Sequence, residues 1–137
     1  MEQPKQTYQL ISITNTESYF KRENALDNNY LKATNNLDLN IAKNFENDQF
    51  GVFLTVHLKQ EFEGKVLVEV KVTTIGVFKK TGDITQEALD AFCNVNAPAI
   101  IFPFVREIIA NLSMKGGIQP IMIQPINFIE LNKQEKK

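Results

Sequence analysis

Residues 96–128, NAPAIIFPFVREIIANLSMKGGIQPIMIQPINF, decide the fold of this chain. The pattern is that of a nearly all-apolar helix, a Gly-Gly stop, and an uncharged segment divided by Pro120 and Pro125. Asn96 is a good N-cap and Gly116 a good C′ residue, so we expect the helix to run between them. Its apolar stripe is wider than a helix lying on one sheet needs. The excess must be buried in a core, between subunits, or against another polypeptide.

The residues before this stretch predict a meander of antiparallel strands. Residues 37–45, 50–62 and 66–78 carry apolar side chains at alternate positions, which is the pattern of a strand with one buried face. Asn47-Asp48 and Glu63-Gly64 are turn-forming pairs between these strands. We therefore expect a sheet with one apolar face, against which the helix packs.

The remaining elements are shorter. We expect an edge strand at residues 8–13, followed by a weakly ordered crossing over residues 14–35. Asp83 or Thr85 is positioned to cap a short helix before the long one. The last ten residues predict a short amphipathic helix. The sequence thus predicts an α+β fold in a single domain of residues 1–137.

Composition excludes several classes of protein. The chain has 137 residues, a net charge of −1 and 43% apolar residues, which is ordinary for one globular domain. A charge so close to zero suggests neither nucleic acid nor an anionic membrane as a partner. We expect no secretory signal, because the N-terminus is polar, and no membrane span, because no run approaches the roughly 18 apolar residues that a span requires. Cys93 is the sole cysteine, so we expect no internal disulfide and a location in the cytoplasm.

No set of residues predicts catalysis. His57 is the sole histidine and has no partner at metal-ligand or acid–base spacing. Cys93 has no histidine near it in the sequence and is expected to be a small core residue. Residues 115–117, Lys-Gly-Gly, follow a helix instead of preceding one, so they predict a helix cap and not a phosphate loop. We expect no enzyme activity, metal or cofactor, which leaves the binding of apolar surface.

Residues 96–128 resemble the signature region of the SecB family, the bacterial export chaperones. The family motif is a Pro-x-x-Ile/Leu-Phe-Pro-Tyr/Phe-x-Arg-Glu helix, a glycine turn, a proline, and a Pro-Val/Ile-Asn-Phe element. The matching residues here are Pro98, Ile101, Phe102, Pro103, Phe104, Arg106, Glu107, Gly116, Pro120, Pro125, Ile126, Asn127 and Phe128. A weaker match extends the resemblance over about residues 8–131.

The resemblance implies both a fold and a function. The fold is a four-stranded antiparallel sheet with a long helix packed on one face and a short C-terminal helix. Such chains assemble into a homodimer or homotetramer with the helices between sheets. They use no cofactor and hold unfolded preproteins in apolar grooves beside the helices, for protein export.

The same resemblance and the apolar pattern assign candidate site residues. Three aromatic positions match the family's substrate groove, and three neighbouring apolar positions are added from the pattern. The expected peptide-binding residues are Phe102, Phe104, Phe128, Ile121, Ile123 and Leu131. The inward strand face that supports oligomer assembly and two residues of the helix form the expected oligomer interface. These residues are Val70, Val72, Thr74, Ile108 and Leu112.

A third set of residues concerns the SecA motor. Family members that deliver clients to SecA use an acidic patch on the outer face of the sheet. Glu17 matches one acidic position, but Lys21 and Lys71 stand where the family has carboxylates, and Glu69 replaces a leucine. Two charge reversals on a patch that meets a cationic, zinc-bearing tail should be repulsive. The sequence therefore supports the fold and the holdase activity more strongly than it supports handover of clients to SecA.

Three functions remain open on the sequence. The first is a SecB-like holdase for preproteins that await export. The second is a SecB-like chaperone dedicated to one client, such as the antitoxin of a toxin–antitoxin module. The third is a binding or scaffold domain that uses the same fold without general chaperone activity.

Overall fold

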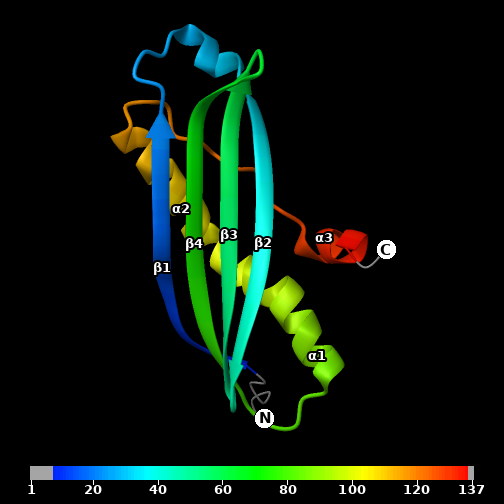
Figure 1. Ribbon diagram of the computed structural model, residues 1–137. Helices are drawn as coiled ribbons and strands as arrows, with labels where there is room; N and C mark the ends of the chain where they lie inside the picture. The colour runs from blue at the N-terminus through cyan, green and yellow to red at the C-terminus, as the bar shows by residue number, and fades with distance from the viewer. Residues whose placement is uncertain (1–7, 136–137) are drawn as a thin grey trace, which may run out of the picture.

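The computed structural model describes residues 8–135 and shows a four-stranded sheet with a long helix across one face (Figure 1). The strands are antiparallel and lie in the order β1-β4-β3-β2. In chain order the elements are β1 (Tyr8–Arg22), η1 (Asn28–Lys32), β2 (Thr34–Glu46), β3 (Gln49–Phe62), β4 (Lys65–Lys80), α1 (Gln86–Ala91), η2 (Phe92–Asn96), α2 (Ala97–Lys115) and α3 (Phe128–Glu135). The predicted fold class is confirmed.

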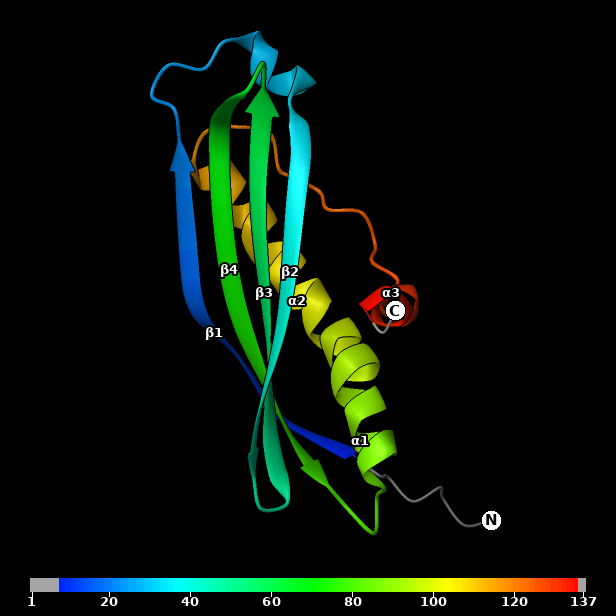
Figure 2. The same ribbon diagram turned by 45° about the vertical axis from the view of Figure 1, so that its right-hand side comes forward.

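The core lies between the inner face of the sheet and α2. Figure 2 shows α2 running diagonally under the sheet, from α1 toward the end of β1. Alternate side chains of β3 and β4 point to this helix and are fully buried, as the alternating pattern predicted. They meet one side of α2, where the buried side chains are Ile101, Val105 and Ile109. The opposite side of α2 has no sheet against it.

The predicted hairpin turns are confirmed, whereas the first strand is much longer than predicted. Asn47 and Glu63 adopt positive φ values of 59° and 52° in the two turns. β1 extends to Arg22 instead of ending at residue 13, through a segment expected to be weakly ordered. Its register against β4 shifts twice, between Leu10 and Ser12 and again before Glu17. These irregularities break the period of two, so the sequence pattern hides the strand.

The long helix also begins earlier than predicted. Thr85 caps α1, and its hydroxyl accepts a hydrogen bond of 3.1 Å from the Ala88 amide. Asn96 was expected to be an N-cap but lies inside the helix, with no side-chain cap bond. A π-helical turn, η2, joins α1 to α2, because the Ala97 amide bonds to the Phe92 carbonyl five residues back. This wider turn leads the chain into Pro98, which has no amide hydrogen to donate.

The helix ends at Lys115 with Gly116 as its C-cap, so the C′ residue is Gly117 and not Gly116 as predicted. Gly117 has a φ of 75°, and its amide bonds to the Met114 carbonyl at 3.0 Å. The next amide, of Ile118, bonds to the Ser113 carbonyl at 3.2 Å, which completes a Schellman motif. Gly116 has an ordinary φ but lies against the ring of Phe20, where a Cβ atom would clash. Gly117 therefore supplies the positive φ that stops the helix, whereas Gly116 leaves room for the Phe20 ring.

The joined helix, residues 86–115, is long and apolar enough to cross a membrane by those two criteria alone. Because the sequence has no uninterrupted apolar run of that length, the sequence alone did not identify this helix as a candidate span. Core helices of water-soluble proteins meet the same criteria, and this helix packs Ile101, Val105 and Ile109 into the core under the sheet. Its packing is that of a core helix.

Gly76 sets how closely α2 approaches the sheet. A Cβ atom at this position on β4 would lie 3.0 Å from the Ile101 Cδ1 atom and 2.9 Å from the Phe78 ring. We expect Gly76→Ala to lower the free energy of unfolding by about 1–3 kcal/mol, because the added methyl group overpacks a filled core. Urea unfolding of both proteins measures the difference.

Gly51→Ala is the matched control. Its Cβ atom would meet the Ile75 Cδ1 atom at 2.9 Å, which is the end of a flexible side chain on the face that no helix covers. Ile75 can turn aside there, so the loss of stability should be clearly smaller. Equal losses at both glycines would contradict a tight contact between helix and sheet.

Candidate polypeptide-binding surface

The side of α2 that faces away from the sheet is apolar and exposed. Ile100, Phe104 and Met114 lie there, and Phe104 keeps 49% of its surface accessible. A monomer of this size normally covers such side chains, and a contiguous apolar patch indicates a binding surface. The surface arises because the sheet covers one side of α2 and the other elements of residues 8–135 leave this side open.

A cavity of about 440 Å³ lies beside this exposed side of α2. Met122, which follows the helix in the chain, forms its far wall and is 62% exposed. Apolar and amide side chains form most of the lining, together with one cation and one anion. The helix residues that line it are Pro103, Arg106, Glu107, Ala110, Asn111 and Met114. The hollow suits an apolar side chain with a polar backbone around it.

Residues 118–127, here called the crossing segment, run in an extended form from the end of α2 to α3. Ile118, Ile121 and Ile123 are buried. The Asn127 side chain then caps α3, accepting a 3.2 Å hydrogen bond from the Glu130 amide. Because Pro120 and Pro125 interrupt regular structure, side-chain burial is what places this segment.

Phe128 anchors α3 to the long helix. It is 4% exposed and packs edge-to-face on Phe102, with ring centroids 5.9 Å apart. Aromatic pairs in this geometry contribute about 0.5–1.5 kcal/mol beyond the burial of their area. The sequence did not reveal this contact, because it joins residues 26 positions apart across a non-periodic segment.

The structure brings the predicted peptide-binding residues to one region but exposes few of them. Phe104 is open to solvent, Leu131 is partly buried, and the others are buried within the chain. The buried members are Phe102, Ile121, Ile123 and Phe128. Their contact with a client remains a prediction, and it requires some of these side chains to become accessible.

The predicted oligomer-interface residues fall into two groups. The sheet residues Val70, Val72 and Thr74 are buried beneath α2, so a second subunit cannot touch them while the helix is in place. Ile108 and Leu112 are only partly buried on α2. The interface role stays a prediction, and for the three sheet residues it can only be indirect, through the shape of the sheet.

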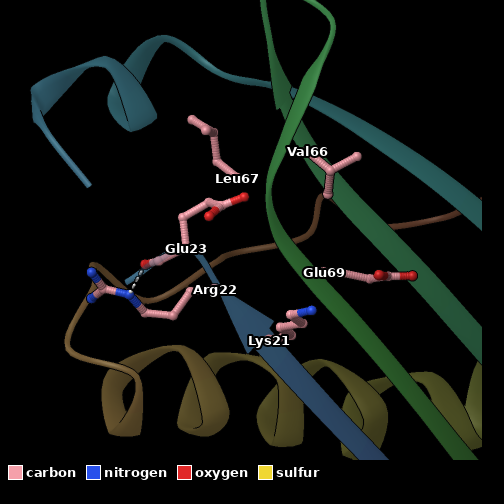
Figure 3. A pocket seen from close by; sticks show the side chains of 6 residues that line it. All are labelled: Lys21, Arg22, Glu23, Val66, Leu67 and Glu69. Atoms are coloured by element: carbon pink, nitrogen blue, oxygen red, sulfur yellow. Dashed lines mark hydrogen bonds between the residues drawn. The ribbon is translucent and has the colours of Figure 1, made fainter. Parts of the chain in front are cut away.

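The outer face of the sheet carries balanced charges. Lys71 lies 3.4 Å from Glu17 on the neighbouring strand, and the His57 Nε2 atom lies 2.6 Å from the Glu69 carboxylate. Lys21 and Glu69 are register partners on β1 and β4, and Figure 3 shows both beside a small hollow of about 140 Å³. The predicted motor-docking residues therefore lie on one face, and most of their charges are matched locally.

The sequence did not predict the contacts of two residues, His57 and Arg22. His57, for which the sequence offered no partner, pairs with Glu69 in a partly buried position. Arg22, which also lines the hollow in Figure 3, donates a 2.9 Å hydrogen bond from its Nη1 atom to the Gly116 carbonyl. A cation there stabilises the negative end of α2. No sequence signal predicts this bond, because the partners are 94 positions apart.

Residues 8–135 contain no group of three or more side chains suited to hold a metal ion. Cys93 is fully buried, and burial raises the pKa of its thiol to about 11; Lys43 lowers this pKa and Asp90 raises it further. Burial and the neighbouring thiol also raise the pKa of the Tyr8 hydroxyl. A buried, protonated thiol is a poor nucleophile.

The raised pKa predicts how stability depends on pH. The folded state disfavours the Cys93 thiolate. The contribution of the buried, protonated thiol to the free energy of unfolding is therefore complete below pH 9 and is lost as the pH rises toward 11. We expect the native protein to lose up to about 3 kcal/mol more than Cys93→Ala between these pH values. Urea unfolding of both proteins at several pH values gives the slopes, and parallel slopes would refute the burial effect.

Comparison with known proteins gives one family. The family model described as preprotein translocase subunit SecB matches residues 15–137. The protein-export protein SecB of Bradyrhizobium diazoefficiens is 35% identical over 100 residues, which cover 72% of this chain and 62% of that protein. The SecB of Orientia tsutsugamushi strain Boryong is 36% identical over 100 residues, covering 73% and 62%. The chain thus spans about three fifths of the length of these relatives.

A solved structure shares the fold. It is a SecB-like chaperone of Mycobacterium tuberculosis in complex with a ChAD peptide from an antitoxin. The two chains superpose with a TM-score of 0.78, covering 88% of this chain and 91% of that one, at 16% sequence identity. An identity this low supports the fold and assigns no function to the surfaces.

Proposed function

Because the chain belongs to the SecB family, we propose that it is a cytoplasmic chaperone that holds unfolded preproteins for export. The observation that carries this proposal is the exposed apolar side of α2, which faces the cavity walled by Met122. No part of the described chain covers this surface. A non-native polypeptide can cover it, because such a chain exposes apolar side chains on an extended backbone. The mechanism is binding without catalysis or a cofactor.

The energetics suit a holdase with low sequence preference. Each client side chain buried on this surface contributes about 1.5–3 kcal/mol. Ordering of the client offsets part of that gain. A homodimer or homotetramer presents several such surfaces to one long client, and linked contacts raise the overall affinity without any new contact. We propose that assembly uses the edge of this side of α2, at Ile108 and Leu112, and leaves Phe104 and the cavity open to a client.

A second candidate is a chaperone with a dedicated client, such as an antitoxin. Two observations favour it. The structural neighbour from Mycobacterium tuberculosis was solved with an antitoxin peptide. The outer face here pairs Glu17 with Lys71 and His57 with Glu69 instead of presenting an acidic patch. A non-chaperone scaffold domain is the third candidate, and failure to suppress aggregation would favour it.

Phe104 tests the holdase proposal. We expect Phe104→Asp to weaken binding of an unfolded protein by about tenfold or more, because a carboxylate replaces an apolar contact of about 1.5–3 kcal/mol. Fluorescence anisotropy with a labelled, permanently unfolded client measures the affinity. Light scattering during refolding of a second protein measures suppression of aggregation.

Tyr19→Asp is the matched control. Tyr19 is exposed to a similar extent, 44%, but lies on the outer face of the sheet. Its replacement should leave client affinity nearly unchanged. Sedimentation of both variants checks that assembly is intact, since α2 also contributes to the proposed oligomer. Equal loss at both positions, or no suppression of aggregation by the native chain, would reject the proposal.

The charge reversals predict weak docking to the SecA motor. We expect the native chain to bind the cationic, zinc-bearing tail of SecA weakly at low salt. The double variant Lys21→Glu, Lys71→Glu should bind it more tightly, because it frees Glu17 and makes the face acidic. Calorimetry at two salt concentrations measures this, and the gain should shrink at high salt. Tight binding by the native chain would contradict this expectation.

A further inference from the structure

Two exposed methionines line one cavity. Met114 lies near the end of α2 and Met122 on the crossing segment, with 54% and 62% of their surfaces accessible. Both line the cavity of about 440 Å³ beside the exposed side of α2. A single exposed apolar side chain is common on protein surfaces and carries little information. Here both methionines of residues 8–135 lie at the same place, on the surface proposed to bind clients.

A methionine side chain differs from leucine or isoleucine in its chemistry toward oxidants. The thioether sulfur takes one oxygen atom from hydrogen peroxide, and the rest of the peroxide leaves as water. The sulfur loses two electrons in this step and the peroxide gains them. The product, methionine sulfoxide, is polar, and methionine sulfoxide reductases convert it back to the thioether with electrons from a pair of thiols. Oxidation therefore turns an apolar contact into a polar one, reversibly.

The cavity holds hydrogen-bond donors that suit a sulfoxide oxygen. Arg106 and Asn111 line it together with the two methionines. Arg106 forms no ion pair with another residue of the described chain, so its guanidinium N–H groups can serve a new acceptor. A sulfoxide that accepts from this group makes the cavity polar. An apolar client side chain then loses the surface that it would cover.

The other sulfur of the described chain is protected from oxidants. Cys93 is fully buried, and burial raises the pKa of its thiol to about 11, so the thiol stays protonated near neutral pH. Peroxide reacts with the thiolate and not with the protonated thiol. A thioether has no proton to lose and needs only to be accessible. Peroxide therefore oxidises the exposed methionines before the cysteine.

We propose that Met114 and Met122 form a reversible oxidation site, through which a peroxide switches off the apolar surface beside α2. In the reduced state the two flexible thioethers add apolar area to this surface. In the oxidised state a client must bury two sulfoxide groups against its own apolar side chains, which is unfavourable. The inference rests on the proposed holdase function and specifies how that function is regulated.

Peptide mapping by mass spectrometry tests the site without a client. After treatment of the full chain with hydrogen peroxide, we expect Met114 and Met122 each to gain one oxygen atom. Their rates should be close to that of N-acetylmethionine amide, because both side chains are exposed. Cys93 should stay unmodified over the same period. Slow oxidation of either methionine, or earlier oxidation of Cys93, would overturn the assignment.

Binding of a labelled, permanently unfolded client, followed by fluorescence anisotropy, measures the effect on function. We expect oxidation to weaken the affinity of the native chain by about tenfold, because the complex buries polar groups that the client does not match. Methionine sulfoxide reductases of both types with dithiothreitol should restore the affinity. The midpoint of urea unfolding should not change, since neither side chain belongs to the core. A fall in this midpoint that accounts for the lost affinity would contradict the proposal.

Variants identify the sulfur atoms responsible. The affinity of each protein after peroxide is divided by that of its own untreated sample. This ratio should fall to about one tenth in the native chain and stay near one in the double variant Met114→Leu, Met122→Leu, which keeps Met1 and Cys93. Adding Tyr19→Met to the double variant places an exposed thioether on the outer face of the sheet, and the ratio should again stay near one.

The outcomes separate the oxidation site from the proposed function. If the untreated native chain binds no unfolded protein, the proposed function fails and the switch with it. If the untreated chain binds and the fully oxidised chain binds equally well, only the switch fails. Loss of affinity in the peroxide-treated double variant would place the effect on other residues, and this result would also overturn the inference.

Discussion

The structure depends on one geometric constraint: a single sheet can bury only one side of the helix laid across it. Gly76 lets Ile101 approach the backbone of β4, and this contact fixes α2 at the middle of the inner face. Everything apolar on the opposite side, including Phe104, is then left for other contacts. The fold thus creates its binding surface by the same packing that gives it a core.

Strands with one buried face and regular pairing were predictable from the sequence, and so were the hairpin turns and the C-terminal helix. β1 was not, because its register shifts conceal the alternation. The helix start was misplaced because Asn96 and Pro98 suggest an N-terminus, whereas the π-helical turn carries the helix through them. Local signals favoured a break that tertiary packing overrides.

The candidate site was predictable in composition but not in accessibility. The apolar pattern identifies Phe102, Phe104 and Phe128 together, yet only the structure shows that two of them cover each other. Likewise, the pairing of His57 with Glu69 and the bond from Arg22 to Gly116 depend on register and on the path of the chain. Family resemblance supplies positions, and physical contacts decide what each position can touch.

Cys93 gives the molecule a built-in reporter. It is the sole thiol of the sequence and lies in the π-helical turn, fully shielded from solvent. Chemical labelling of this atom requires the long helix to separate from its surroundings, so the labelling rate counts rare openings of the core in the resting protein.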